Sequence, residues 1–387
     1  MKNNIPLGHI RGIRVGLSWS VLLIAGFYVY ILATYQFPRE AYFLSDTAYW
    51  IAGIVGALGF FLSLLVHEMS HALMAQRRGI GVRGITLWLL GGYAELESEP
   101  TTPGQQFIIA AVGPVSNLAL GGIFWLAHLW VAGDADVFAV GIGTSGLVAV
   151  VLGWLAFVNF LLGAFNLLPA APLDGGQLFS AGVWAVTGNR TAARKWSAYA
   201  GVALGGAGVA YGLAAMNSSE SFNGIWLMII GWWIISVALS DLRRTGAETA
   251  LSAATAADIM RPSPPILPAN LSIDRALAVG APDPFPPAFC AQAPDGRITG
   301  LLTAEQIRNT DAGSRATVPL GQLAFPIDRV AVARVDESSL DLVDRLRGNA
   351  VGQILVVGHD GQVAGTVGAT ELNRAAARRT NGVSAGR

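Results

Sequence analysis

The stretch FFLSLLVHEMSHALMAQRR, residues 60–78, begins as an apolar helix and ends in a dense group of ionisable side chains. Within it, His67, Glu68 and His71 form the pattern H-E-x-x-H. Two helical residues four positions apart lie on one face, so both imidazoles can bind one metal ion. Glu68 is then placed to act as the general base toward a metal-bound water. The pattern alone can arise by chance, but ionisable side chains inside a membrane span are costly and mark function.

The composition predicts a membrane protein. Of 387 residues, 53% are hydrophobic and 13% are charged, and the mean hydropathy is +0.50. Soluble domains carry about 25% charged residues, so most of this chain belongs in lipid. A net charge of zero and the lack of a basic patch give no indication of a nucleic-acid partner, and we expect none. The single cysteine, Cys290, excludes an intrachain disulfide and a thiolate metal site, and we expect it to be buried and structural.

Six apolar runs are long enough to be membrane spans. They lie at about residues 15–33, 50–75, 106–132, 146–168, 198–216 and 225–239. The first run lacks a clear small-residue cleavage site, so we interpret it as a span and not as a cleaved signal.

The distribution of basic residues predicts the orientation of these spans. One set of loops contains Lys2, Arg11, Arg14, Arg77, Arg78, Arg83, Arg190, Arg194, Lys195, Arg243 and Arg244. The opposite loops contain Arg39 together with the acids Glu40, Asp46, Asp134, Asp136 and Glu220. By the positive-inside rule, both termini and the motif end of the second span face the cytoplasm.

Between the second and third runs, residues 81–100 (GVRGITLWLLGGYAELESEP) are too few to cross the membrane. They predict two strands that turn at Gly91 and Gly92. Backbone at membrane depth must be paired or line a cavity, so we expect a re-entrant hairpin at the mouth of the active site. A peripheral loop is the alternative. An exposed strand edge there would suit an extended peptide substrate.

The segment NLLPAAPLDGG, residues 166–176, supplies a third candidate ligand, because zinc hydrolases usually have three protein ligands. Pro169 and Pro172 disfavour helix and predict that the fourth span breaks into extended chain. Asp174 follows the break on the same side as the two histidines. Gly175 and Gly176 would permit the tight backbone that turns the carboxylate toward the metal. The alternative is a plain loop acid after a proline break.

The two motifs together resemble the site-2 protease family of intramembrane zinc metalloproteases, over about residues 8–244. This resemblance implies that His67, His71 and Asp174 bind one zinc ion per chain. It also implies that Glu68 is the catalytic base, and that Asn166 positions the scissile peptide or its oxyanion. The hairpin fits the membrane-associated sheet of this family.

A further signature of the family is similar to GPVSN, with Gly113, Pro114 and Asn117 on the third span. We expect it to serve helix packing, since small residues let spans approach closely, and we assign Asn117 no chemistry. The resemblance also implies the plasma membrane of a bacterium, a lipid bilayer around the chain, and membrane-anchored substrates such as an anti-sigma factor.

The composition changes after residue 244. Residues 245–256 are rich in Ala, Thr and Ser and predict a linker. Two similar units follow, residues 257–311 and 312–376, and residues 377–387 are expected to form a flexible tail. Each unit predicts a helix, a strand–turn–strand and a closing helix, with turns at Asp295–Gly296 and Asp360–Gly361.

This internal repeat resembles a tandem CBS-domain pair, which implies a regulatory unit that binds adenine nucleotides and forms homodimers. Two positions depart from the family pattern. Where ribose-binding members often have Thr or Ser followed by Asp three residues later, this chain has Thr303 with Gln306 and Gly368 with Glu371. Nucleotide binding at the pair is therefore left open, with no residue assigned to it.

The sequence thus predicts an α-helical polytopic membrane protein with six transmembrane helices and a re-entrant hairpin, plus a cytoplasmic α/β CBS pair. The predicted function is an intramembrane zinc metalloprotease, with residues 1–244 as the protease core. The alternatives are a CBS-gated transporter and an inactive protease-like scaffold. Glu68 favours the protease, because metal-assisted hydrolysis needs a base beside the histidines and a transport site does not.

Overall fold

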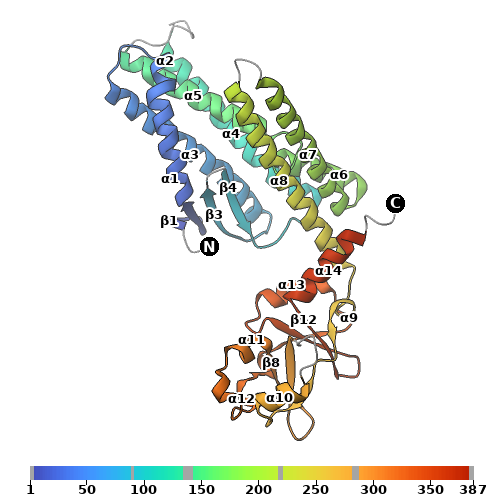
Figure 1. Cartoon of the computed structure of the whole chain (residues 1–387). Coiled ribbons are helices and arrows are strands. Elements are labelled where there is room, and N and C mark those ends of the chain that lie inside the picture. Colours follow the sequence, from blue (N-terminus) through green and yellow to red (C-terminus); the bar gives the residue numbers. More distant parts are fainter. Residues whose placement is uncertain (1–3, 89–90, 134–142, 217–220, 281–286, 383–387) are drawn as a thin grey trace. The chain divides into compact units, whose positions relative to one another are not determined.

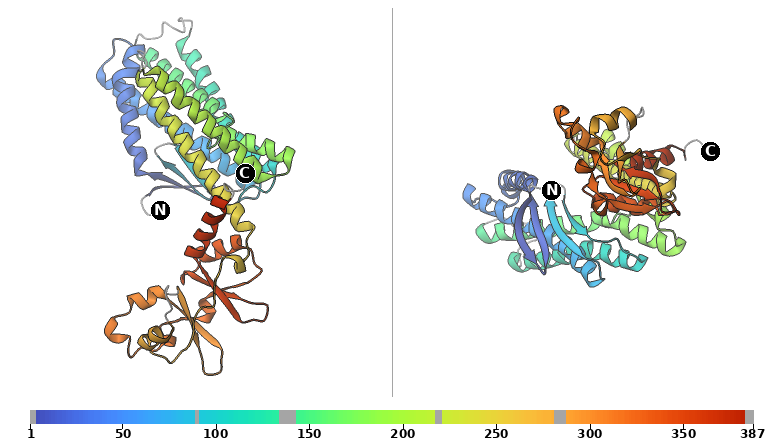
Figure 2. Two further views of the ribbon diagram at one scale, coloured as in Figure 1. Left: turned by 45° about the vertical axis from the view of Figure 1, so that its right-hand side comes forward. Right: turned by 90° about the horizontal axis from the view of Figure 1, so that it is seen from below.

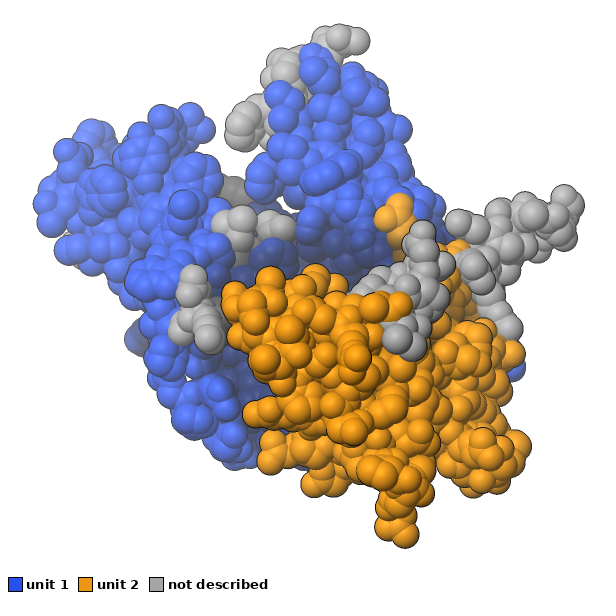
Figure 3. Space-filling view, turned by 60° about the horizontal axis from the view of Figure 1, so that its bottom comes forward, with its two compact units in different colours: residues 1–242 blue, residues 243–387 orange. Residues whose placement is uncertain are grey.

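The structure is a computed structural model that describes residues 4–88, 91–133, 143–216, 221–280 and 287–382 (Figure 1). The chain divides into two compact units, Met1–Leu242 and Arg243–Arg387 (Figure 3).

Within the described residues of the first unit, the six predicted spans are confirmed as helices long and apolar enough to cross a membrane. Helix α1 (Trp19–Ile31) continues through a π-helical turn, η1 (Leu32–Gln36), into α2 (Phe37–Glu40). The other five are α3 (Asp46–Arg77), α4 (Pro103–Ala132), α5 (Gly143–Asn166), α7 (Arg190–Ala215) and α8 (Ser221–Ser252). Many of their large apolar side chains are exposed, among them Leu23, Leu126 and Trp232, as expected for helices that face lipid.

The sequence also explains where α3 and α4 begin. Ser45 caps α3 by accepting a hydrogen bond from the N–H of Ala48 at 3.3 Å, and Asp46 adds negative charge to the first turn. Thr102 caps α4, and Pro103 occupies the first helical position, where its missing N–H costs nothing.

A four-stranded sheet lies beside α3, in the order β1-β2-β3-β4 (Figures 1 and 2). Its strands are β1 (Asn4–Ile10), β2 (Ile13–Ser18), β3 (Val82–Trp88) and β4 (Gly91–Leu96). Strand β2 is parallel to β3, and the other two pairs are antiparallel. The predicted hairpin is therefore half of a larger sheet, and β4 is one of its two edge strands.

The N-terminal half of this sheet corrects the sequence prediction. Residues 15–18 form β2, so the first span begins at Trp19. The short alternation Ile13–Arg14–Val15, with Arg14 exposed between two buried residues, is typical of a strand. Together with Met69 and Ala72 of α3, the buried residues of β2 and β3 form a small core.

The predicted turn at Gly91 and Gly92 is also corrected, because both glycines are the first residues of β4. Residues 89 and 90, which connect the two strands, lie outside the described residues.

The fourth span ends at Asn166, and the short helix α6 (Asp174–Thr187) begins at Asp174. The predicted break at the prolines is confirmed, although residues 167–173 form turns and bends and not extended chain. Gly175 and Gly176 lie inside α6, so they do not supply an unusual backbone conformation. They are needed for close packing, since a Cβ on Gly175 would lie 2.3 Å from the carbonyl oxygen of Leu167.

Helix α7 forms hydrogen bonds with the loop between α5 and α6 and with α6 itself. Ser197 accepts a hydrogen bond at its carbonyl oxygen from the N–H of Ala171 at 3.1 Å, and its hydroxyl donates to the carbonyl of Gly176 at 2.8 Å. One buried serine thus joins the loop before Asp174 to the helix that carries it.

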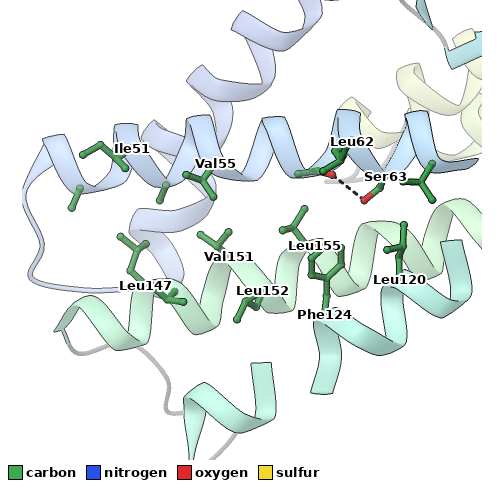
Figure 4. Close-up of a pocket in the computed structure, with 15 residues that line it drawn as sticks. Ile51, Val55, Leu62, Ser63, Leu120, Phe124, Leu147, Val151, Leu152 and Leu155 are labelled. Atoms are coloured by element: carbon green, nitrogen blue, oxygen red, sulfur yellow. Dashed lines mark hydrogen bonds between the residues drawn. The ribbon is translucent and has the colours of Figure 1, made fainter. Parts of the chain in front are cut away.

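An apolar cavity of about 590 Å³ lies between α3, α4 and α5 (Figure 4). Its single polar side chain is Ser63, whose hydroxyl donates to the carbonyl of Gly59 at 2.9 Å and accepts from Asn159 at 3.1 Å. The other labelled residues that line it are Ile51, Val55, Leu62, Leu120, Phe124, Leu147, Val151, Leu152 and Leu155. This cavity contains no group that could act in hydrolysis.

The second unit contains two four-stranded sheets with matching connectivity, β6-β7-β8-β9 and β10-β11-β12-β5. The strands of the first sheet are β6 (Ile266–Pro268), β7 (Ala288–Gln292), β8 (Ile298–Thr303) and β9 (Phe325–Pro326). Those of the second are β10 (Ala331–Arg334), β11 (Gln353–Val357), β12 (Val363–Gly368) and β5 (Arg261–Pro262). In each sheet the first pair is parallel and the others are antiparallel, as a duplicated α/β module requires.

In the part of the second unit that the structure describes, seven α-helical segments accompany the sheets. They are α9 (Ala256–Ile259), α10 (Ile273–Gly280), α11 (Ala304–Asn309), α12 (Leu320–Leu323), α13 (Ser339–Arg347), α14 (Ala369–Gly382) and the tail of α8. The short 3₁₀ helices η2 (Ala312–Ser314) and η3 (Ile327–Arg329) lie between them.

The duplication confirms the predicted CBS-like pair, and both predicted turns are present. Gly296 and Gly361 have φ of +85° and +79°, a conformation that favours glycine. Asp295 and Asp360 each accept a hydrogen bond from the N–H two residues on, at 3.0 Å.

The predicted module boundaries are corrected. Residues 245–252 continue α8, so they are not a linker, because Leu251 is buried in the core of the second module. The boundary after residue 311 falls too early, since β9 joins the first sheet and β5 joins the second. The helix α14 extends to Gly382, so part of the predicted tail is ordered chain.

Cys290 on β7 is fully buried among apolar residues of both modules. Burial raises the pKa of its thiol to about 11, which keeps the thiol protonated and inert. The expected structural cysteine is confirmed.

Candidate metal centre and active site

Two imidazoles and one carboxylate converge between α3 and α6. The Nε2 atoms of His67 and His71 lie 3.1 Å apart, as the spacing of four residues predicts. Asp174, the first residue of α6, places its Oδ2 3.0 Å from Nε2 of His67 and 3.2 Å from Nε2 of His71. The three predicted ligands are therefore brought together from residues more than a hundred positions apart.

The outer nitrogens of both rings have fixed partners. Nδ1 of His71 lies 2.7 Å from the carbonyl oxygen of Ile109 on α4. Nδ1 of His67 lies 3.2 Å from Oδ1 of Asn117, which is eight residues after Ile109 on the same helix. Since a carbonyl oxygen only accepts, each Nδ1 carries the proton, and each Nε2 presents a lone pair.

This arrangement leaves three acceptor atoms facing one another: two imidazole nitrogens and a carboxylate oxygen. Such atoms repel unless a cation lies between them. In a tetrahedral zinc site with bonds of about 2.0–2.1 Å, neighbouring ligand atoms are about 3.3 Å apart. The observed separations of 3.0–3.2 Å are close to that spacing, so the donor set fits zinc.

Asn117 makes a contact with the candidate centre that the sequence prediction missed, since that prediction assigned it no chemistry. It is fully buried and accepts the Nδ1–H of His67, so it fixes the tautomer and the orientation of that ring. The signal available in the sequence was a polar residue inside an apolar span, which usually has a partner.

We expect Asn117→Leu to weaken zinc binding by about 10- to 100-fold, the usual cost of losing a hydrogen-bond partner of a ligating histidine. The measurement is competition of the purified protein against a chelator. Asn117→Asp keeps an acceptor oxygen at the same place and serves as the matched control. Equal zinc affinity in Asn117→Leu and wild type would show that the contact does not hold the ring.

Gly113 on α4 faces both histidine ligands. A Cβ at this position would lie 2.1 Å from Nε2 of His71 and 2.8 Å from Cε1 of His67. The packing role predicted for the Gly113 signature is therefore specific: the absence of a side chain at Gly113 leaves the space that the two imidazoles occupy.

Glu68 lines a cavity of about 770 Å³ together with His67, Asp174 and Asn166. The sheet contributes to the same cavity through Thr86, Trp88, Gly91, Gly92 and Tyr93, and α8 contributes Trp233 and Val237. A Cβ on Gly92 would lie 2.4 Å from Cγ of Glu68, so the edge strand β4 packs directly on this glutamate. The predicted position of the hairpin against the site is confirmed by this contact.

The fold and the site together define a class of protein: a polytopic membrane protein with two histidines and one carboxylate that could hold a metal ion, and an adjacent glutamate. Comparison with known proteins agrees with this class. The sequence model of the family named Peptidase family M50 matches residues 55–207.

Two relatives match nearly the whole chain. The chain is 35% identical over 346 residues to the putative zinc metalloprotease Rip3 of Mycobacterium tuberculosis, covering 89% of this chain and 86% of the relative. It is 31% identical over 370 residues to a putative zinc metalloprotease of Synechocystis, covering 94% of this chain and 93% of the relative. The chain belongs to peptidase family M50, the site-2 proteases, and is a zinc metalloprotease.

Solved structures resemble parts of the chain. The site-2 protease from Methanocaldococcus jannaschii is 22% identical, with a TM-score of 0.41, over 62% of this chain and 95% of that one. The CBS domain of a bacterial CNNM/CorC family Mg²⁺ transporter is 15% identical, with a TM-score of 0.30, over 41% of this chain and 95% of that one.

Proposed function

We propose that this protein hydrolyses a peptide bond in membrane-anchored regulatory proteins, such as single-span anti-sigma factors. The observation that carries the proposal is the position of Glu68. It lies beside the three metal ligands in a cavity that spans and sheet enclose together. Hydrolysis needs a base, a metal site and room for an extended peptide at one place.

His67, His71 and Asp174 would hold the zinc ion, which supplies Lewis-acid polarisation of a water molecule and of the scissile carbonyl. Glu68 takes a proton from the attacking water and returns it to the leaving amine nitrogen as the C–N bond breaks. Asn166, the last residue of α5, lines the same cavity and is assigned to donate a hydrogen bond to the carbonyl oxygen as negative charge develops there.

The proposal is tested with purified protein in lipid vesicles and in cells. Wild type is expected to cleave a co-reconstituted single-span protein, and Glu68→Gln is not. In cells, proteomics of the membrane fraction should show intact single-span proteins accumulating in the Glu68→Gln strain. Identical membrane proteomes, with no cleavage by wild type in vesicles, would contradict the proposed function.

The substrate is proposed to bind as an extended strand along β4. Peptide bonds within a helix are shielded, so a substrate span must unwind before water can attack. The described sheet ends at β4, and that strand packs on Glu68 through Gly92. A segment added to this edge would receive main-chain hydrogen bonds and lie next to the base.

Proline substitution along β4 tests this docking. Tyr93 and Ala94 are adjacent on β4, so the N–H of one of them faces β3 and the N–H of the other faces the open edge. We expect the proline that removes the outward N–H to reduce cleavage while zinc content is unchanged. The proline that removes the inward N–H disrupts the sheet and serves as the contrast. Full activity in both variants would contradict strand docking.

The location proposed for the protein is the plasma membrane of a bacterium, with both termini in the cytoplasm. The support is the excess of basic residues in one set of loops, including Arg77, Arg83, Arg190 and Arg194. Cleavage is then proposed to occur near the cytoplasmic face.

The second unit is proposed to regulate the protease and to form a homodimer. At the two positions where ribose-binding CBS domains often have Asp, this chain has Gln306 and Glu371. Gln306 accepts a hydrogen bond from the N–H of Thr303 at 2.9 Å, and Glu371 accepts one from the N–H of Gly368 at 3.1 Å. Because both side chains cap helices, we expect weak adenine-nucleotide binding.

The regulatory role is tested by ending the chain after Thr245 and comparing it with the full chain. Full-length protein is expected to have the mass of a dimer in detergent, and the shortened form that of a monomer. Ligand coupling of typical size would change cleavage by about 5- to 150-fold, measured with and without ATP or AMP. Two forms of equal mass and equal activity under all conditions would contradict regulation by this unit.

A further inference from the structure

The sheet has a second cavity, of about 540 Å³, on the face that does not pack on α3. Its centre is a row of three residues across neighbouring strands: Arg14 on β2 pairs with Gly84 on β3, and Gly84 pairs with Glu95 on β4. Gly84 has no side chain, so the row is a floor with Arg14 on one side and Glu95 on the other. Arg83 also lines the cavity, and its charge is partly offset by Glu97 at 3.7 Å. Two strand spacings, about 10 Å, separate the two charged residues.

Both charges are exposed and available. Among the residues that the structure describes, the side chains of Arg14 and Glu95 have no hydrogen-bond or ion-pair partner. The two acids that follow in the chain differ, because Glu97 lies 3.7 Å from Arg83, and Glu99 lies 2.8 Å from Arg190 and is also paired with Arg194. Of the three glutamates at the end of the hairpin, Glu95 alone has its charge free for a ligand.

This cavity shares a lining residue with the active-site cavity. Thr86 lines both cavities, and β4 contributes to each of them. Along β4, Gly92 packs on Glu68, and Glu95 follows three residues later, about 10 Å further at the rise of a strand. An extended substrate that reaches Glu68 therefore reaches Glu95 with a residue about three positions from the cleaved bond.

We propose that this cavity is a charge-selective subsite in which Glu95 binds a Lys or Arg side chain from the polar flank of the substrate. The inference rests on the proposed function and adds to it a requirement on the substrate. A strand added to β4 would place one side chain directly opposite Glu95 on the same face, about 4.5–5.5 Å away between Cβ atoms. Arg14 lies on the far side of the glycine floor, two strand spacings from Glu95.

A basic partner is favoured by the chemistry of the substrate class. The cytoplasmic flank of a membrane span is enriched in Lys and Arg, so a single-span protein offers a cation just beyond its apolar segment. Recognition of that cation would set the register of the extended segment and so select which bond faces Glu68.

The test uses full-length protein in vesicles of neutral lipid and single-span substrates that differ at one flank position, with Lys, Gln or Glu. Mass spectrometry of the products locates the cleaved bond, and the test position is moved stepwise along the flank. We expect kcat/KM for Lys over Gln to be about two- to fivefold at one position about three residues from the bond, the range of exposed ion pairs. Glu95→Gln should bring this ratio to one, and Glu95→Lys should reverse it in favour of Glu.

Glu97→Gln is the matched control, because it removes a neighbouring exposed acid that already has a partner. It should retain the preference for Lys. An unchanged ratio in Glu95→Gln, an equal loss in Glu97→Gln, or no charge preference at any flank position in wild type would overturn the subsite. In each of those outcomes the protein would still cleave substrate in a manner that depends on Glu68. If the proposed function itself were wrong, no substrate would be cleaved in this way.

Discussion

Replacing Glu68 with glutamine is expected to lower the rate of peptide hydrolysis by at least about a hundredfold, the least that a general base typically contributes. Glutamine has nearly the same shape as glutamate, so it can fill the space under Gly92 of β4. It cannot take a proton from water. The measurement is cleavage of a single-span substrate in vesicles, with zinc determined on the same sample by elemental analysis.

The zinc measurement separates chemistry from structure. Glu68 is not one of the three atoms that converge at the metal centre, so we expect about one zinc per chain in both proteins. Asp174→Ala gives the contrasting result, because it removes a ligand and should lower zinc content as well as activity. A loss of less than about tenfold in Glu68→Gln would be too small for a general base and would remove this role from Glu68.

Much of the site could be predicted from the sequence because its main contacts are local or lie next to a strong break signal. His67 and His71 share a helical face through their spacing alone. Asp174 was found through the prolines before it, which end α5 and let the chain turn back. The hydropathy of the spans likewise predicted all six transmembrane helices, with errors only at their ends.

The parts that were missed depend on pairing between distant segments. Strand β2 is short, and its apolar residues run directly into α1, so periodicity cannot separate it from a span. Its parallel pairing with β3, some seventy residues later, exists only in the folded chain. The same limit applies to β5 and β9, two-residue strands that exchange between the modules and so displaced the predicted boundary.

Gly175 and Gly176 illustrate a different limit. The sequence identified them correctly as necessary near Asp174 but gave the wrong reason, a tight turn in place of close packing. Glycine is required both where the backbone is unusual and where another chain segment is close. Only the structure distinguishes the two cases, and Gly113 is the more consequential example of the second.

Gly113→Ala is expected to reduce zinc affinity by about a hundredfold or more, beyond the usual effect of a residue that only supports a ligand. The added Cβ would lie 2.1 Å from Nε2 of His71, the atom that binds the metal, and 2.8 Å from the ring of His67. Both imidazoles must move, and Asp174, which meets them at a single oxygen, cannot follow both. Zinc affinity measured by chelator competition, together with cleavage activity, checks the prediction.

Gly122→Ala is the control on the same helix, because a Cβ there meets no atom within 4 Å. Alanine is a better helix former than glycine by about 1 kcal/mol, so neither change weakens α4 by itself. Gly122→Ala should therefore bind zinc and cleave substrate like wild type. A loss of zinc confined to Gly113→Ala would arise from the space that the histidine pair needs, whereas full zinc binding in that variant would show that α4 can move away from α3 without disturbing the ligands.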